Sequence, residues 1–390
     1  LNDAFELSGI RFAKFAIEVM LQDELPLRSR IKAYQLIEKS DDRGCIALLE
    51  EFNYDFEPIQ QYFQLFINMM IQILQSQRDD SSFDFANIFF HNAGASFEDG
   101  KVFLYVIQAS AELTNLEAIG VQIGLFLLYS IVESQQEYFS EYIDIVVKYI
   151  VEYADCEDDY ILTYAFYLLI EMAEYVAPSL TTKIDIIVTF LMKHVNHQEG
   201  LRTLDIVLDH ALDPPSDLSG FIQTLITISQ QANSEQVVLL ISCIASSISS
   251  AYQPNEDVYN LICPVLNDAL EESNEEIQKV AIRCFGNLTI ISPRSSAGEI
   301  EKVADMLMQV FTQGNYTTDI VLFIESIICL TKLCKNLPIS FEPYFDDFAQ
   351  IITTLSNEGN EAEKKEENEE EDQSDDFNRM QAQLLLCIAT

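Results

Sequence analysis

A two-part apolar pattern recurs along this 390-residue chain about every forty residues. Each copy opens with a long apolar-striped stretch, passes a short polar break and continues into a second striped stretch. The copies begin at Glu117, Glu157, Gln198, Ser234, Glu275 and Thr317, at offsets of 40, 41, 36, 41 and 42 residues. The spacing of apolar residues within a stretch is that of an α-helix. Because one helical hairpin cannot bury its own apolar face, we expect the hairpins to stack on one another.

The length of the period indicates the class of repeat, since two helices in about 40–47 residues are typical of HEAT repeats. We predict an all-α fold, an α-α superhelix of HEAT or armadillo type with roughly nine repeats. The low content of Gly (12) and Pro (10) agrees with a mainly helical chain. The six clearest helix pairs are expected at residues 119–132 with 138–151, 160–176 with 180–194, 201–212 with 218–228, 237–248 with 258–270, 277–291 with 300–311, and 320–333 with 344–355.

Short polar side chains mark the expected helix starts, because their oxygens can accept hydrogen bonds from the first free N–H groups. We expect N-caps at Ser140, Ser179, Asp217, Asn255, Ser273 and Thr317. Nearer the N-terminus, Phe56-Glu-Pro should open an apolar helix. Residues 76–96 are predicted to be irregular, with a break at His91-Asn-Ala-Gly94, before a helix over 97–113.

The domain organisation follows from the composition. Residues 1–356 are expected to form the HEAT solenoid. Residues 357–377 are almost entirely polar and acidic, so we predict a disordered acidic insertion, or else an ordinary solvated linker. Residues 378–390 resemble the start of a further HEAT repeat. Because the chain stops within that apolar stretch, we expect a fragment of a longer array.

The net charge of −41, from 63 acidic and 22 basic residues, limits the possible partners. Direct binding of nucleic acid is not expected, because phosphates are bound by clustered Lys and Arg. The charge favours basic partners such as histones, ribosomal proteins or basic targeting peptides. The alternative interpretation is that the acidity confers only solubility.

No catalytic or cofactor-binding pattern is recognisable, so we predict a protein that is not an enzyme and binds no cofactor. The histidines His194, His197 and His210 are interpreted as surface residues and not as a metal site. The apolar run 119–132 is too short to span a bilayer, and no membrane insertion is expected. The eight cysteines form no CxxC pair, which suits a reducing compartment.

Recognition is therefore the predicted activity. We expect the second helices to line the concave side of the solenoid and to carry an acidic ladder for basic cargo, or a solvated stripe without a ligand. The ladder residues are Glu141, Asp144, Asp185, Asp257, Glu299, Glu301, Asp346 and Asp347. Grooves between outer helices are expected to accept an inserted aromatic side chain, although aromatics at helical spacing are mostly core. The candidate residues near such grooves are Phe126, Tyr129, Phe166 and Phe285.

Several segments resemble the importin-β (karyopherin-β) superfamily. The run Glu275-Glu-Ile-Gln-Lys-Val-Ala-Ile-Arg-Cys-Phe-Gly-Asn-Leu288 resembles the first helix of a HEAT repeat. Phe56-Glu-Pro-Ile59 and Phe341-Glu-Pro-Tyr-Phe345 resemble the Phe-x-Pro-Tyr turn of this family, and Tyr138-Phe-Ser-Glu-Tyr-Ile143 is a looser version. Residues 117–196 are most similar to importins that carry ribosomal proteins and histones. An amino-terminal Ran-binding pattern is not recognisable.

The resemblance implies a nuclear transport receptor of the cytoplasm, the nucleus and the nuclear pore. Its partners would be basic protein cargo, Phe-Gly nucleoporins and Ran-GTP, which would regulate the release of cargo. The resemblance assigns no residue of this chain to Ran binding. The alternative is a HEAT scaffold subunit of a stable phosphatase, vesicle-coat or chromosome-organising complex, because HEAT repeats also build such assemblies.

Overall fold

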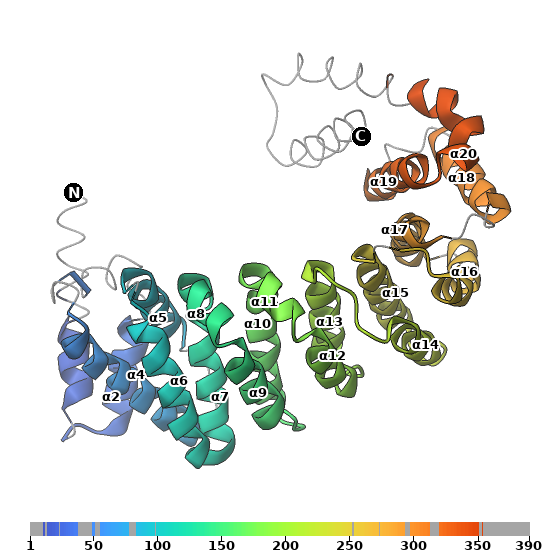
Figure 1. Cartoon of the computed structure of the whole chain (residues 1–390). Helices are drawn as coiled ribbons and strands as arrows, with labels where there is room; N and C mark the ends of the chain where they lie inside the picture. Colours follow the sequence, from blue (N-terminus) through green and yellow to red (C-terminus); the bar gives the residue numbers. More distant parts are fainter. Residues whose placement is uncertain are drawn as a thin grey trace. The chain divides into compact units, whose positions relative to one another are not determined.

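The computed structural model is helical throughout the part of the chain that it describes (Figure 1). It describes residues 11, 14–22, 24–37, 49–50, 55–77, 83–97, 99–251, 253–272, 274–292, 297–312, 320–350 and 353. The acidic run at 357–377 and the expected further repeat at 378–390 lie outside these residues. The chain separates into two compact units, Leu1–Lys193 and His194–Thr390, and each is described by itself.

The first unit is a succession of helices joined by short connections. Its elements are α2 (Leu27–Ile37), α4 (Phe56–Gln77), α5 (Asp84–Ser96), α6 (Lys101–Leu113), η1 (Thr114–Leu116), α7 (Glu117–Tyr129), η2 (Glu133–Gln135), α8 (Gln136–Glu141), α9 (Ile143–Tyr153), α10 (Asp159–Tyr175), α11 (Ala177–Thr181) and α12 (Ile184–Lys193). The expected helix start at Phe56 is therefore confirmed.

These helices form two layers that are held by aromatic and polar contacts between repeats. In the α6 layer (α4, α6, α9 and α12), the rings of Phe63 and Tyr105 lie 5.2 Å apart. In the same layer the Tyr149 hydroxyl donates a hydrogen bond of 3.2 Å to the Ser110 carbonyl oxygen. In the α7 layer (α5, α7 and α10), Phe126 lies 5.6 Å from Tyr164 between ring centroids. Within each layer, the equivalent helices of successive repeats therefore contact one another.

One apolar stretch of the described residues, 101–129, is long and apolar enough to cross a membrane by length and composition alone. It contains α6, η1 and α7, and α6 and α7 pack against each other. Buried residues of this stretch include Val106, Ile123 and Leu127. The contacts within the repeat stack therefore explain its apolar character.

The expectation that residues 76–96 are irregular is wrong for α5, which runs through the predicted break at His91-Asn-Ala-Gly94. At Gly94 the turn after α7 comes close to the backbone of α5, and the helix continues beyond this residue. A Cβ atom there would lie 2.1 Å from the Ser134 hydroxyl oxygen. The Gln135 amide also donates hydrogen bonds to the carbonyl oxygens of Gly94 (2.7 Å) and Phe97 (3.2 Å). The turn after α7 is therefore packed directly on the end of α5.

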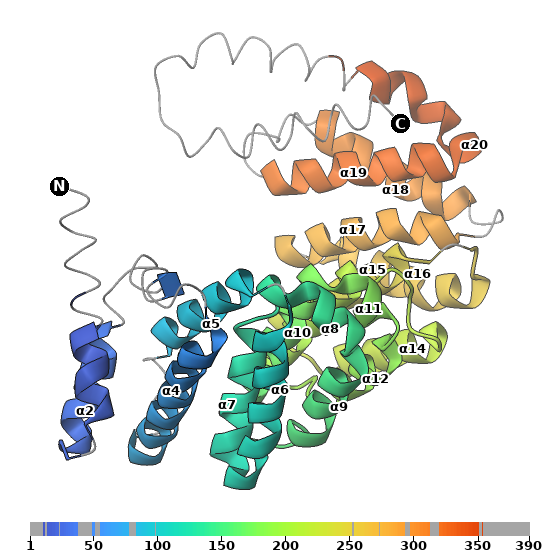
Figure 2. The ribbon, with the colours of Figure 1, turned by 60° about the vertical axis from the view of Figure 1, so that its left-hand side comes forward.

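The second unit continues the alternation of helices. Its elements are α13 (Gln198–His210), α14 (Leu218–Ser229), α15 (Ser234–Ser249), α16 (Glu256–Glu271), α17 (Glu275–Ile291), α18 (Ala297–Thr312), α19 (Ile320–Asn336), α20 (Pro338–Phe341) and η4 (Glu342–Tyr344). Helices α13, α15, α17 and α19 pack successively against one another and form the α15 layer. Figure 2 shows α17 and α19 side by side in this layer. Helices α14, α16 and α18 form the α16 layer.

The predicted period is confirmed, but the predicted pairing of helices is shifted by one helix. Helix α15 packs along α14, and α17 packs along α16, whereas α15 makes few contacts with α16. The connections between these contacting pairs are short, at residues 230–233 and 272–274. The longer breaks that carry Pro254 and Pro293 separate one contacting pair from the next. Short connections favour antiparallel neighbours, and the periodicity alone does not reveal this phase.

The helix starts confirm part of the predicted capping. The side chains of Asp217 and Asn255 accept hydrogen bonds from the Gly220 and Val258 N–H groups, at 3.0 and 3.1 Å. Ser140 and Ser179 instead lie inside α8 and α11, while Ser273 and Thr317 lie outside the described residues. Three further caps were not predicted: Asp158 caps α10, Asn274 caps α17, and Asn233 forms a capping box with Gln236 at the start of α15.

The α15 layer lies along the inner side of the bend within the second unit, and the α16 layer lies along the outer side (Figure 1). The prediction that second helices line the inner side is therefore wrong for this unit. Small side chains explain the close packing of the inner layer. A Cβ atom on Gly286 of α17 would lie 3.2 Å from the Cys329 Cα of α19. Such an approach requires a residue without a side chain or with a very small one.

A polar network connects the helices of the α15 layer. The hydroxyls of Ser242 and Ser246 on α15 each donate a hydrogen bond of 2.7 Å to the Asp205 carboxylate on α13. Arg283 on α17 donates a hydrogen bond of 2.9 Å to the Ser242 hydroxyl oxygen. Burial raises the pKa of the Asp205 carboxyl, while the two serines and Arg283 act in the opposite direction. The Ser242 hydroxyl thus connects three successive repeats, because it donates to Asp205 on α13 and accepts from Arg283 on α17.

The same network continues toward the C-terminus. The Asn287 amide on α17 donates a hydrogen bond of 2.8 Å to the Ala245 carbonyl oxygen on α15. Lys332 on α19 donates to the Asn287 side-chain oxygen. The Asn336 amide donates to the Thr289 hydroxyl oxygen at 2.8 Å. Burial lowers the pKa of Lys332. Polar side chains therefore reinforce the apolar contacts across α13, α15, α17 and α19.

We expect Asp205→Ala to destabilise the second unit by about 1–3 kcal/mol, because two partly buried serine hydroxyls lose their acceptor. Asp205→Asn should cost less, since the amide oxygen still accepts a hydrogen bond. Asp209→Ala, at an exposed position one turn later on α13, is the control and should change stability little. Urea unfolding of the three variants measures the effect. Equal losses for Asp205→Ala and Asp209→Ala would contradict the assigned role of the network.

Candidate functional site

An apolar groove lies between the neighbouring helices α9 and α12 of the first unit. Its volume is about 330 Å³, and it is lined by Asp144, Val147, Lys148, Val151, Glu152, Lys183 and Ile186. Val147 forms its floor and is buried, while half of the Ile186 side chain is exposed (50%). Lys183 forms an ion pair with Asp144 at the edge of the groove. The arrangement of an apolar floor with a charged edge suits a small apolar group inserted from a partner.

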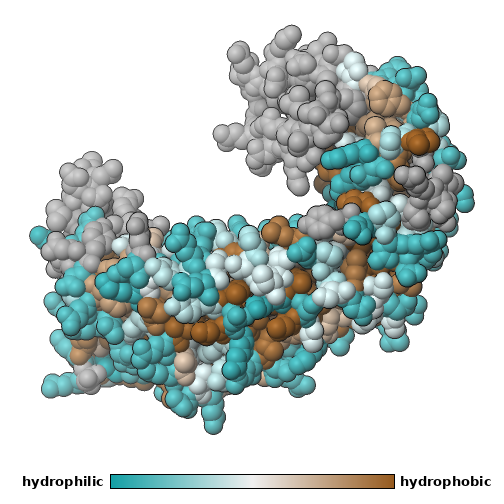
Figure 3. Space-filling view, in the orientation of Figure 1, coloured by the Kyte–Doolittle hydropathy of each residue, from teal (hydrophilic) through white to brown (hydrophobic). Residues whose placement is uncertain are grey.

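The groove belongs to a larger hydrophobic surface on the α6 layer. Leu104, Ile145 and Ile186 lie on α6, α9 and α12 at intervals of 41 residues, and each is about half exposed. Figure 3 shows hydrophobic surface on this face of the first unit. Large apolar residues that repeat on successive helices and remain exposed are typical of a binding surface.

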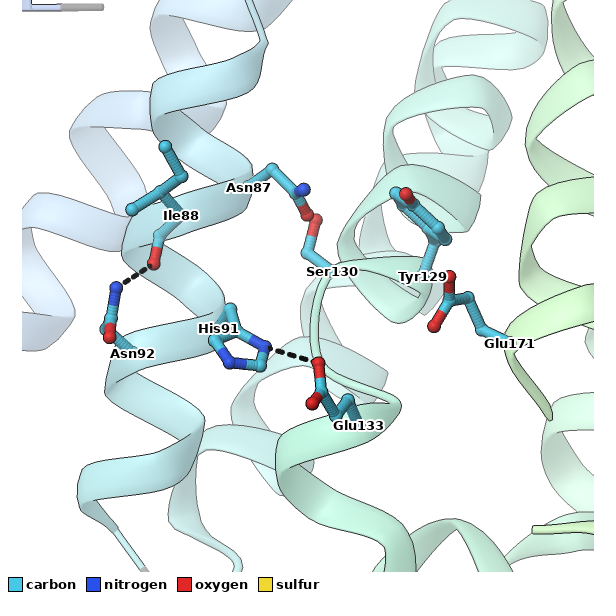
Figure 4. Close-up of a pocket in the computed structure, with 8 residues that line it drawn as sticks. All are labelled: Asn87, Ile88, His91, Asn92, Tyr129, Ser130, Glu133 and Glu171. Atoms are coloured by element: carbon cyan, nitrogen blue, oxygen red, sulfur yellow. Dashed lines mark hydrogen bonds and ion pairs between the residues drawn. The ribbon is translucent and has the colours of Figure 1, made fainter. Parts of the chain in front are cut away.

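A second, polar pocket lies in the α7 layer, and Figure 4 shows its residues. Its volume is about 350 Å³. The lining residues come from three successive helices and the turn after α7: Asn87, Ile88, His91, Asn92, Tyr129, Ser130, Glu133 and Glu171. In Figure 4 the Glu171 carboxylate lies beside the Tyr129 ring, while Glu133 faces His91. The Nδ1 atom of His91 lies 3.8 Å from the Glu133 carboxylate.

The electrostatic environment of this polar pocket is unfavourable for its own carboxylates. Burial raises the pKa of Glu171, and the negative charges of Glu174 and Glu133 raise it further. Burial also raises the pKa of Tyr129, with a contribution from the charge of Glu171. The Glu171 carboxylate is therefore held beside an aromatic ring, and the residues that line the pocket include neither Lys nor Arg.

The predicted acidic-ladder residues are exposed wherever their side chains are described. Glu141, Asp144 and Asp185 lie on α8, α9 and α12 of the first unit. In the second unit, Asp257 and Glu301 lie in the α16 layer, and Asp346 and Asp347 follow η4. Glu299 belongs to α18, but its side chain lies outside the described part. Helices α16 and α18, which carry Asp257 and Glu301, lie on the outer side of the bend, so the predicted inner ladder does not run along these two helices (Figure 1).

Three of the four predicted groove aromatics are core residues. Phe126, Phe166 and Phe285 are each at most 2% exposed, so they offer no surface to an inserted side chain. Tyr129 is half-buried and lines the polar pocket. The apolar groove uses Val147 and Ile186 instead, residues that the sequence analysis did not single out. The interval of 41 residues between Ile145 and Ile186 is the signal that identifies this surface.

Metal chemistry finds no support in the geometry of the described residues, where no three His, Cys, Asp or Glu side chains gather as a ligand set. His194 and His197 lie in and beside the turn before α13, and His210 lies at its C-terminal end. Six cysteines of the described part are free thiols. Burial raises the pKa of Cys284 and Cys329 to about 12, which makes these two thiols unreactive core groups.

Together these features define an α-α superhelix of HEAT type, the fold that karyopherins have. Kap121p bound to Nup53p is 12% identical with a TM-score of 0.61, and the match covers 90% of this chain and 36% of Kap121p. Kap121p bound to RanGTP is 14% identical with a TM-score of 0.56, covering 91% of this chain and 36% of Kap121p. Importin beta is 13% identical with a TM-score of 0.55, covering 90% of this chain and 43% of its own length.

The chain therefore spans less than half the length of these transport receptors. An engineered protein is also similar, with 14% identity and a TM-score of 0.53 over 99% of this chain and 95% of its own length. No protein-family profile and no curated protein matches the sequence. The similarity is thus one of fold, and the described neighbours other than the engineered protein are transport receptors and not enzymes.

We expect Glu171→Gln to raise the melting temperature at pH 7. The raised pKa of Glu171 means that its ionised form is less favourable in the folded chain than in the unfolded chain. The gain should be full above the folded-state pKa and should vanish as the pH falls below the ordinary value of 4.5. Thermal unfolding between pH 7 and low pH measures it, with exposed Glu137→Gln as the control. A loss of stability at pH 7 would contradict the prediction.

Proposed function

We propose that this chain belongs to a nuclear transport receptor of the importin-β superfamily that carries basic proteins. The observation that carries the proposal is the apolar groove between α9 and α12, on a fold shared with Kap121p and importin beta. Receptors of this class must cross a barrier formed by Phe-Gly nucleoporins. A groove between two helices of one layer offers a phenylalanine side chain an apolar site without unfolding the repeats.

The dimensions and chemistry of the groove support a phenylalanine ligand. The aliphatic side chains of Val147, Val151 and Ile186 provide the apolar contacts. Lys183 and Asp144 neutralise each other at its edge, so the groove needs no charged ligand. Full burial of one phenylalanine contributes roughly 1.5–3 kcal/mol, which gives weak and rapidly reversible contacts. Leu104 and Ile145 extend the surface, and several weak contacts add through multivalency.

Charge supports basic protein cargo as the second ligand. The net charge of −41 attracts positively charged segments and accelerates their encounter with the chain. Ribosomal proteins and histones are the cargo that this charge suits best. Kap121p has been solved with Nup53p, with Pho4p and with RanGTP, and we extend binding of Ran-GTP to this chain as a proposal. Cargo and Ran-GTP would then oppose each other by preferring different arrangements of the repeats, in both cytoplasm and nucleus.

A Phe-Gly binding assay tests the groove. We expect the chain to bind an immobilised Phe-Gly repeat peptide, and Ile186→Asp to weaken binding about tenfold or more through loss of apolar contact. The fold should persist, because the Ile186 side chain is half exposed. Leu116→Asp is the matched control, since Leu116 is similarly exposed (42%) but lies in η1, outside the α6 layer and the groove. Equal loss in both variants would refute the assignment of the groove.

A pull-down separates the transport receptor from the alternative of a scaffold subunit. We expect immobilised Ran loaded with GTP to retain the chain, and Ran loaded with GDP to retain much less. Addition of a basic cargo peptide should reduce retention if cargo and Ran-GTP oppose each other. A chain that binds neither Ran-GTP nor Phe-Gly repeats, and that co-purifies with a fixed set of subunits, would establish the scaffold function instead.

A further inference from the structure

The strong cations of this acidic chain are segregated by layer. Between residues 84 and 193 the four lysines belong to the α6 layer, because three lie on α6, α9 and α12 and Lys183 directly precedes α12. In the described part of the second unit, five of the six Lys and Arg residues lie instead in the α15 layer, on the inner side of the bend (Figure 1). These five are Arg202 on α13, Lys279 and Arg283 on α17, and Lys332 and Lys335 on α19.

Four of these residues, on two neighbouring helices, make up a basic patch: Lys279, Arg283, Lys332 and Lys335. Helices α17 and α19 pack against each other and lie side by side in Figure 2. Beyond the two glutamates in the first turn of α17, the two helices contain these four cations and one carboxylate, that of Glu325. The basic patch is therefore net positive in a chain whose net charge is −41.

Arg283 and Lys332 are fixed in place mainly by neutral groups. The Arg283 guanidinium donates a hydrogen bond of 2.9 Å to the Ser242 hydroxyl oxygen and lies 4.0 Å from the Asp205 carboxylate. Lys332 donates to the Asn287 side-chain oxygen, and in the described part of the chain it has no carboxylate within ion-pair distance. A guanidinium group has five N–H donors and an ammonium group has three, so both side chains retain donors for a ligand.

The charge of these two side chains is unfavourable in a way that the fold does not require. Burial lowers the pKa of Lys332, and the positive charge of Arg283 lowers it further, while Glu325 and Asp209 act in the opposite direction. The hydrogen bond that joins α19 to Asn287 could be donated equally well by a neutral amide. The contact between the two helices therefore does not explain why position 332 is charged.

We propose that the basic patch binds an acidic segment of a partner protein, whose Asp or Glu carboxylates are held by Arg283 and Lys332. The side chain of Arg283 is 37% exposed, so a carboxylate can reach its guanidinium from solvent. The planar guanidinium forms paired hydrogen bonds with a carboxylate, and the Lys332 ammonium adds a second charge-assisted contact. The inference goes beyond the proposed function and does not depend on it, since this partner has the opposite charge to the basic cargo.

The short range of electrostatic forces in salt makes a site for acidic groups compatible with the acidity of the whole chain. At physiological ionic strength the Debye length is about 8 Å, so a bound carboxylate interacts mainly with the cations beside it. A short acidic segment fits the basic patch better than a nucleic acid, because a long polyanion would extend over carboxylate-rich parts of the chain. Lys335 is exposed about one turn beyond Lys332 and provides a further contact for such a segment.

Binding of a glutamate-rich peptide to the 390-residue chain tests the basic patch. The probe is a fluorescent peptide of alternating Glu and Ser at physiological ionic strength, and the reference is the same peptide with Gln in place of Glu. We expect Arg283→Gln/Lys332→Gln to weaken binding of the Glu peptide about tenfold or more, because glutamine keeps a donor for Ser242 and Asn287 but removes the charge. Lys335→Gln should weaken binding about threefold and leave urea unfolding unchanged, since this position is exposed.

The control is Lys101→Gln/Lys302→Gln, which removes the same charge as the double variant from exposed positions outside the α15 layer. Loss of binding in both patch variants with normal binding by the control supports the proposal. Equal loss in the control shows that net charge governs binding and overturns it, as does equal binding of the Gln peptide. A loss confined to the double variant and accompanied by a lower urea midpoint reflects unfolding and also counts against the basic patch.

Two further measurements identify other occupants. If the chain binds the Glu peptide only after residues 357–377 are deleted, the basic patch belongs to the chain's own acidic run, and a partner ligand is overturned. Displacement of the Glu peptide by inorganic triphosphate at equal concentration would assign the basic patch to small phosphates and would likewise overturn a protein ligand.

Discussion

The structure depends on close contact between equivalent helices of successive repeats. No single hairpin buries its apolar face, so each helix of the α15 layer is stabilised by the next copy. The approach is possible because residues at the contact are small, such as Gly286 opposite Cys329. Polar side chains then fix the relative position of the helices, and Asp205 alone contacts two serines of the neighbouring repeat. Apolar burial provides the attraction, and the polar network determines the register.

Much of this arrangement follows from the sequence, and the exceptions have physical reasons. The period and the helical class are predictable because apolar residues recur at a helical spacing over many copies. Which two helices form a contacting hairpin is not predictable, because a repeating pattern is equally regular whichever helix is counted first. Breaks with Pro254 and Pro293 look like hairpin turns, yet the contacting hairpins use the shorter connections at 230–233 and 272–274. Gly94 was misleading for a related reason, since a glycine selected for close packing resembles one that ends a helix.

The candidate sites were less predictable than the fold. Acidic residues are so frequent in this chain that no particular carboxylate stands out from the sequence. What distinguishes Glu133 and Glu171 is their neighbourhood, which joins residues 84 positions apart from Asn87 to Glu171 in one pocket. The prediction that Phe126 and Phe166 lie at surface grooves is wrong, because both are buried. Buried and exposed aromatic residues recur at the same helical spacing, so the sequence does not distinguish them. Exposed aliphatic residues that recur at 41 residues carry the more useful signal.

Between residues 84 and 193 lysine is confined to the α6 layer, which has a practical consequence for experiments on this protein. Amine-reactive cross-linkers, acetylation and ubiquitin attachment all act on the lysine Nζ atom. Between residues 84 and 193 every such acceptor lies on α6, on α9, on α12 or directly before α12. Chemical footprinting based on amines will therefore map only that face. Carboxylate-directed reagents are required to detect a partner that covers α5, α7 and α10.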